Sequence, residues 1–302
     1  MKKAICYGIL GSLFFAFTFI FNRSMNLSGG YWAWSACLRY FFTLPVLLIL
    51  VIPKGQIREV MQSIKKQLRI WLLWSSVGFG LFYAPLSMAS VYGESWLVAA
   101  TWQITIVAGV LLTPIFGQRI PIKNLLMSGV ILTGILLLQI QHVGEEIGFG
   151  MWKALGLILV AAFSYPLGNR KMMAHCMKDH LNTLQRVFGM TLMSMPFWLL
   201  LSIEAFIKAG MPSRGQIYQS VIVAVFSGVI ATILFFEATN MVKDNPKQLA
   251  VIEATQSGEV LFTLAGGCMF LKDALPGVVG GLGIVIVVVG MIGNSFLGNQ
   301  GS

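Results

Sequence analysis

Ten apolar stretches, each long enough to cross a membrane as a helix, constrain the fold of this chain more than any other feature. They lie near residues 5–25, 31–53, 69–92, 95–117, 123–141, 150–172, 184–208, 216–241, 248–270 and 276–298. About 20 residues of helix span the roughly 30 Å of hydrocarbon in a bilayer. Because only helices and closed barrels satisfy every backbone polar group in lipid, the stretches predict an all-α membrane protein with ten transmembrane helices.

The composition argues against a water-soluble domain. Of the 302 residues, 57% are hydrophobic and only 11% are charged, whereas about a quarter of the residues in a soluble domain are charged. The net charge of +10 comes from basic residues between the apolar stretches, so we interpret it as a signal of membrane orientation and expect no nucleic-acid partner. The four cysteines show no Cys-x-x-Cys spacing, and we expect free thiols.

Lysine and arginine are distributed unequally between the two sides of the predicted bundle. With the N-terminus inside, 15 of the 21 basic residues lie in inner segments, five lie in outer segments, and Arg39 lies within a stretch. Such an excess follows the positive-inside rule. We therefore expect both termini in the cytoplasm.

The two halves of the chain resemble each other. Residues 22–25 match 169–172 and Arg39 matches Arg186 at an offset of 147, and residues 81–83 match 234–236 and Gln103 matches Gln256 at an offset of 153. Each half has five predicted spans, an odd number, so the second half enters the membrane in the opposite orientation. Inverted repeats of this kind place a substrate site at their interface. We expect one repeat in residues 1–145 and the second in 146–302; duplication that merely builds a scaffold is the alternative.

A polar stripe in the ninth stretch is the main candidate site. Glu253, Gln256 and Glu259 are spaced three apart, so they fit within an arc of roughly 120° on a helix. Glu259 lies near the predicted midplane, where desolvation disfavours the charged carboxylate and lets it bind and release a proton near neutral pH. This chemistry suits proton coupling or a cationic substrate. The alternative is an internal ion pair with Arg39 or Arg186 that joins helices.

Other polar residues within the stretches extend the candidate site. Arg39 is predicted to lie about 12 Å below the outer surface, and Glu237 either contributes to the site or reaches the inner interface. An intramembrane charge costs a few kcal/mol or more unless it is paired or hydrated. In the fourth stretch, Trp102 can hold a cation over its ring, and Gln103 offers a neutral hydrogen-bonding group; Trp102 packing in the core or facing lipid is the alternative.

Enzyme motifs are missing from the sequence. There is no P-loop, no Gly-x-Ser-x-Gly and no His-Glu-x-x-His. The three histidines lie in predicted loops without a second ligand cluster, so we expect no metal site and no cofactor. The intramembrane carboxylates keep a membrane-embedded enzyme open as an alternative of another class.

Several segments resemble a known family. Residues 36–45 (Ala-Cys-Leu-Arg-Tyr-Phe-Phe-Thr-Leu-Pro) resemble the arginine-bearing second helix of the drug/metabolite transporter superfamily. Residues 95–103 and 253–259 are similar to its multidrug-resistance efflux branch. The resemblance implies a ten-helix bundle of inverted repeats with a central cavity, located in a bacterial inner membrane. Many relatives place Gly-Glu at the end of the fourth helix, where this chain has Gly117-Gln118, so no carboxylate acts at that position.

These observations predict a secondary transporter that exports small metabolites or amphipathic, cationic compounds by alternating access, driven by a proton gradient. Its partners would be a small-molecule substrate, protons and the lipid bilayer, and it would act as a monomer or homodimer. The alternative within transport is an uncoupled exchanger or facilitator of an anionic or zwitterionic metabolite, with Arg39 and Arg186 binding the anion.

Overall fold

The computed structural model describes residues 1–117, 119–120, 122–140, 148–242, 248, 251–252 and 254–298. Regular structure in these residues is helical. The first part of the chain contains α1 (Lys2–Leu27), α2 (Trp32–Val51), η1 (Ile52–Lys54), α3 (Ile57–Lys66), α4 (Leu68–Ser75), η2 (Ser76–Gly80), α5 (Leu81–Ala89), α6 (Ser95–Trp102), α7 (Ile104–Leu111), η3 (Thr113–Phe116) and α8 (Ile122–Ile140). The second part contains α9 (Gly148–Lys178), α10 (Thr183–Ala209), α11 (Arg214–Val223), η4 (Ala224–Ala231), α12 (Thr232–Asn240), η5 (Thr255–Ser257), α14 (Gly258–Gly266), η6 (Gly267–Leu271) and α15 (Val278–Gly298).

Membrane-spanning helices account for most of the described chain. Six continuous helical segments are long and apolar enough to cross a bilayer: 2–27, 32–54, 68–89, 150–178, 183–209 and 214–239. Shorter apolar helices cover 95–111, 125–138 and 278–294. Each of these nine segments overlaps one of the ten predicted stretches. The remaining stretch, 248–270, lies partly outside the described residues, as does the expected boundary between the repeats near residue 145.

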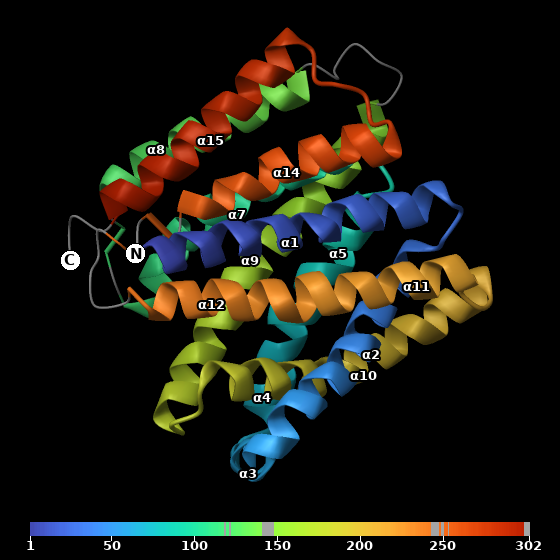
Figure 1. Cartoon of the computed structure of the whole chain (residues 1–302), viewed down its shortest axis with the longest axis vertical. Helices are drawn as coiled ribbons and strands as arrows, with labels where there is room; N and C mark the ends of the chain where they lie inside the picture. The colour runs from blue at the N-terminus through green and yellow to red at the C-terminus, as the bar shows by residue number, and fades with distance from the viewer. Residues whose placement is uncertain are drawn as a thin grey trace.

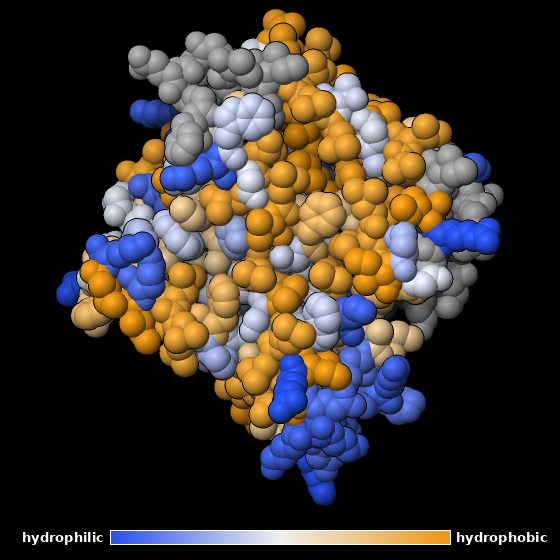
Figure 2. Space-filling view, turned by 180° about the vertical axis from the view of Figure 1, so that it is seen from behind, coloured by the Kyte–Doolittle hydropathy of each residue, from blue (hydrophilic) through white to orange (hydrophobic). Residues whose placement is uncertain are grey.

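The surface of the bundle is apolar over a broad band. Ile49, Leu136, Leu200 and Ile207 are each at least 60% exposed, and Figure 2 shows hydrophobic residues over most of the face in view. Water would disfavour so large an apolar surface, whereas hydrocarbon accommodates it. A hydrophilic region at the lower tip of the same view covers α3.

Helices from distant parts of the chain pack side by side (Figure 1). The pair α8 and α15 lies along one edge of the bundle, where Gly134 and Gly283 bring the two backbones together: a Cβ atom on either would lie 2.8 Å from the carbonyl oxygen of the other. Elsewhere, α5 crosses α9, α1 runs beside η4 and α12, and α2 packs on α10. In lipid, no hydrophobic force drives helices together. Small residues at the contact let two helices approach closely, and the resulting packing holds them together.

The connection between α2 and α4 contains the amphipathic helix α3. Its inner face buries Val60, Ser63 and Ile64, while its basic residues remain exposed. This arrangement is typical of a helix lying in the membrane interface. Residues 57–66 of this connection therefore form a helix against the bundle.

Ser63 anchors α3 to the end of α9. The indole Nε1 of Trp71 donates to the Ser63 hydroxyl at 3.0 Å, and this hydroxyl donates to the Asp179 carboxylate. His175 Nε2 lies 3.7 Å from the same carboxylate. The sequence placed His175 in a loop, which is wrong: α9 continues to Lys178, because the polar residues beyond the apolar stretch extend the helix past the membrane.

We expect Gly168→Ala to destabilise the fold, because a Cβ at this position of α9 would lie 2.3 Å from the Cα of Gly78. The backbones would have to separate, and overpacking of this kind costs about 1–3 kcal/mol. Thermal unfolding of the detergent-solubilised protein, followed by tryptophan fluorescence, measures the loss. Gly156→Ala is the matched control, since a Cβ there meets nothing within 4 Å. Equal melting temperatures for both variants would contradict the close crossing.

Candidate functional site

A central cavity lies between the helices of both halves and encloses about 1110 Å³, part of it open to the outside. About half of its lining residues are aromatic or aliphatic, and the other half are polar, many of them threonines. Five of the seven sequence-predicted residues line it: Arg39, Trp102, Gln103, Gln256 and Glu259. A cavity that combines apolar walls with convergent polar groups is a usual form of a small-molecule site.

Two interrupted helices position the polar residues of the cavity. The fourth stretch breaks at Gln103, between α6 and α7, and the ninth changes to a 3₁₀ turn at Thr255–Ser257 before α14 begins. The sequence did not predict these local changes within the two stretches. Side chains three apart lie on the same face both in a 3₁₀ turn and in the α-helix that follows it. This geometry brings Gln256 and Glu259 to the same cavity wall.

Glu259 is the one acidic residue among the described lining residues of the central cavity. It is 9% exposed and lies in the first turn of α14. Its backbone carbonyl accepts a hydrogen bond from the Thr263 hydroxyl at 2.7 Å. A buried carboxylate facing a cavity can exchange a proton with water or a ligand.

Arg39 is the basic residue of the same cavity and is fixed by side chains of three other helical segments. Its guanidinium donates to the hydroxyls of Thr18 (3.1 Å) and Ser227 (3.2 Å), which are themselves 2.6 Å apart. It also lies over the ring of Tyr83, with Cζ 4.1 Å from the ring centroid. Arg39 and Glu259 interact electrostatically, although no salt bridge within 4.0 Å joins these two described residues. The cavity therefore contains separated opposite charges.

Trp102 packs in an aromatic group that forms one wall. Its ring centroid lies 5.1 Å from Phe82 and 5.7 Å from Tyr165. Gln103 is buried, and its amide donates to the carbonyl of Ala99 at 3.0 Å, within its own helix. The remaining acceptor of Gln103 is a hydrogen-bonding group for the cavity.

The other predicted residues lie elsewhere. Glu237 is exposed and lines a separate pocket with Lys54, so the structure does not bring it to the central cavity. Glu253 and Gln118 lie outside the described residues. Arg186 is not among the described residues that line the central cavity.

The sequence interpretation missed the residues that hold Arg39. Thr18, Ser227 and Tyr83 come from α1, η4 and α5, and nothing in their local sequence shows that they meet at one guanidinium. A search for small hydroxyl residues within apolar stretches would have included the first two, together with many others.

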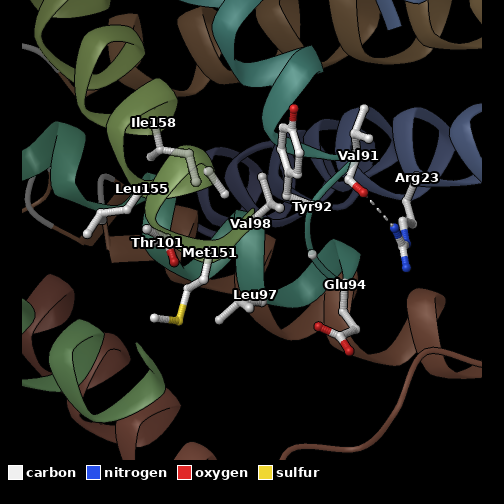
Figure 3. A pocket seen from close by; sticks show the side chains of 12 residues that line it. Arg23, Val91, Tyr92, Glu94, Leu97, Val98, Thr101, Met151, Leu155 and Ile158 are labelled. Atoms are coloured by element: carbon white, nitrogen blue, oxygen red, sulfur yellow. Dashed lines mark hydrogen bonds between the residues drawn. The ribbon is translucent and has the colours of Figure 1, made fainter. Parts of the chain in front are cut away.

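A third pocket lies near the predicted outer side, between the ends of α1, α6 and α9, and has a volume of about 650 Å³, part of it open to the outside. Figure 3 shows Arg23 and Glu94 at one side of an otherwise largely apolar lining that includes Met151. Arg23 donates to the carbonyl of Val91 at 3.4 Å. Its Nε is 4.0 Å from the Asp273 carboxylate.

Metal chemistry has no visible basis in the described part of the chain. No group of three or more His, Cys, Asp or Glu side chains there could hold a metal ion. The chemistry that the central cavity offers is reversible protonation, ion pairing and stacking on aromatic rings.

Comparisons with known proteins agree with a membrane carrier. The family model described as "EmrE: Putative multidrug resistance efflux transporter" matches residues 2–300. An uncharacterized protein of Bacillus subtilis (strain 168), YjlA, is 48% identical, with 97% of this chain and 94% of that protein covered. An uncharacterized 42.1 kDa protein of Shouchella clausii is 43% identical over 86% of this chain and 70% of its own length.

One solved structure, described only as a crystal structure of a protein, has a TM-score of 0.67 at 10% identity and covers 99% of both chains. At this identity the likeness concerns the fold alone. The family match extends over nearly the entire sequence and agrees with the apolar helices and the central cavity. The chain therefore belongs to the EmrE multidrug resistance efflux transporter family, a family of membrane transporters.

Proposed function

We propose that this protein is a secondary transporter that exports small amphipathic metabolites or cationic compounds by alternating access, with proton coupling at Glu259. The observation that carries the proposal is the buried carboxylate of Glu259 in a cavity that also holds Arg39 and Trp102. One carboxylate couples the flux of protons to the flux of substrate if the proton and the substrate bind to it alternately. Binding of a cationic group beside Glu259 then releases its proton, and reprotonation releases the substrate.

Paired packing supports an arrangement of ten helices in two inverted repeats, residues 1–145 and 146–302. The first helix of the chain packs on η4 and α12, and α9 packs in the corresponding way on η2 and α5. The interruptions at Gln103 and at Gln256 are 153 residues apart, the same offset as the sequence repeat. Inverted repeats permit alternating access by rocking of one set of helices against the other.

The central cavity is proposed to face the cytoplasm in this conformation. Its lining includes Val187 near the start of α10 and Phe235 in α12. These positions lie on the inner side if both termini are cytoplasmic, as the distribution of basic residues favours. The start of α1 and the end of α15 lie at the same end of the bundle in Figure 1, which supports this topology. The location would be a bacterial inner membrane, and one chain supplies a complete cavity, so a homodimer is not required.

Replacing Glu259 by Gln should abolish proton coupling, because the amide cannot exchange a proton. Proteoliposomes containing a pH-sensitive dye are challenged with lipophilic cations and amino-acid-like metabolites. Wild-type protein should move protons when a transported compound is added, and Glu259→Gln should fall to the level of protein-free liposomes. Glu204→Gln, at a carboxylate that binds Lys208 outside the cavity, should retain coupling. Proton coupling at Glu259 would be refuted if wild type and Glu259→Gln moved substrate at equal rates without any change in pH.

The second candidate is an uncoupled exchanger of an anionic or zwitterionic metabolite, favoured by the position of Arg39 in the cavity wall. Arg39→Gln and Ser227→Ala separate the two functions. Under proton-coupled export, both variants should lose about 1–3 kcal/mol of stability, because each removes hydrogen bonds at the buried guanidinium. The folded protein should still bind cations in both variants. Under anion exchange, Arg39→Gln should lose substrate binding and Ser227→Ala should keep it. Equilibrium binding at a temperature below unfolding distinguishes the outcomes.

A further inference from the structure

The pocket that contains Glu237 lies between the ends of α2 and α12 and the start of α10. It has a volume of about 630 Å³, part of it open to the outside. Its walls are mainly aliphatic, formed by Leu47, Leu50, Leu184, Val187, Val229 and Ile233. Lys54 and Glu237 supply the charged groups of this lining, and both are exposed.

This inner pocket adjoins the central cavity. Val187, Gly228 and Thr232 line both spaces. Along α12, Glu237 lies five residues beyond Thr232, or about 7.5 Å at the helical rise. A molecule held at Glu237 thus lies about one and a half helical turns from Thr232, which lines both spaces.

The charges of the inner pocket are available to a ligand. Within the described part of the chain, the side chains of Lys54 and Glu237 form no hydrogen bond and no salt bridge with other residues. A ligand with one charge would be attracted by one of them and repelled by the other. A zwitterion can satisfy both and place an aliphatic body against the leucine and valine side chains.

The same pairing of charges recurs in each of the three pockets. Arg23 and Glu94 line the outer pocket, Arg39 and Glu259 the central cavity, and Lys54 and Glu237 the inner pocket. Each lining contains one basic and one acidic side chain, with the remainder neutral. A zwitterion is complementary to such a pair, and in the inner pocket neither charged side chain is bound by another described residue.

We infer that the pocket between Lys54 and Glu237 is a cytoplasmic loading site for an amino-acid-like zwitterion with an aliphatic side chain, from which the molecule passes to the central cavity. Its ammonium group binds Glu237 and its carboxylate binds Lys54. This inference rests on the proposed transport function and names the substrate class. It assigns Glu237 to capture of the substrate and leaves proton exchange to Glu259.

Three matched probes test the assignment: L-leucine, L-leucinamide and 4-methylpentanoate have similar aliphatic bodies but are a zwitterion, a cation and an anion. Binding is measured at equilibrium with the full chain in phosphatidylglycerol nanodiscs, a lipid without an ammonium group. Leucine should bind more tightly than either singly charged probe. Lys54→Gln and Glu237→Gln should each weaken leucine binding about three- to fivefold, as expected for a solvent-exposed ion pair.

The variants and controls separate a local effect from loss of the fold. Lys65→Gln removes an exposed lysine from α3, outside the pocket, and should leave leucine affinity unchanged. For leucinamide, Glu237→Gln should weaken binding, whereas Lys54→Gln should not. Unchanged melting temperatures show that the two exposed substitutions leave the protein folded.

Several results would overturn the loading site. They are failure of leucine to bind at millimolar concentration, equal binding of leucine and leucinamide, and leucine affinity insensitive to both substitutions. Retention of phosphatidylethanolamine by wild type but not by Lys54→Gln in native mass spectrometry, with no leucine binding, would instead identify a lipid site. If coupled transport of another compound persists in both variants, the proposed function stands and the loading site fails. If leucine binds as expected but moves no protons in proteoliposomes, the loading site stands and proton coupling fails.

Discussion

The guanidinium of Arg39 imposes the central constraint on this bundle. A charge within apolar helices must be hydrated or surrounded by acceptors, and here Thr18 and Ser227 accept from it while the ring of Tyr83 covers it. These partners belong to α1, η4 and α5, so a single side chain of α2 fixes three other helical segments around the cavity. The tyrosine is in turn held by its own hydrogen bond to Asn22, at 3.2 Å. The solvation of one cation thereby determines how the helices surrounding the cavity are placed.

The helix interruptions at Gln103 and Gln256 also place polar groups within the membrane, in this case groups of the backbone. A break in a helix leaves backbone groups without their usual partners, which is tolerated within a membrane only where protein or water replaces them. The hydroxyl of Ser12 in α1 donates to the carbonyl of Thr255 at 2.6 Å and so satisfies one of these groups. The breaks turn polar side chains into the cavity while the adjoining helices continue across the bundle. Neither site contains proline, the residue that most often breaks a helix.

Much of the fold and part of the site could be predicted from the sequence, because lipid reduces the possible structures to a few. Long apolar stretches must be helices, and the nine described apolar segments agree with this. Polar residues in such stretches are costly, so Arg39, Gln103, Gln256 and Glu259 could be selected by type and spacing. Helix periodicity could not show that Glu237 faces a different pocket, since this depends on how α12 is rotated against α2 and α10. The breaks at Gln103 and Gln256 escaped prediction because tertiary contacts stabilise them.

The crossing of α9 and η2 at Gly168 and Gly78 has a mechanical consequence. The two backbones touch here with no side chain of either residue between them, so the glycine pair can act as the pivot of the crossing. Gly168 lies 20 residues from the start of the 31-residue helix α9, a lever arm of about 30 Å. A rotation of about 10° at this pivot displaces that end of the helix by about 5 Å. Met151 and Leu155, which line the outer pocket, lie on this arm. A small rotation at the glycine pair therefore produces a large change in the width of the outer pocket.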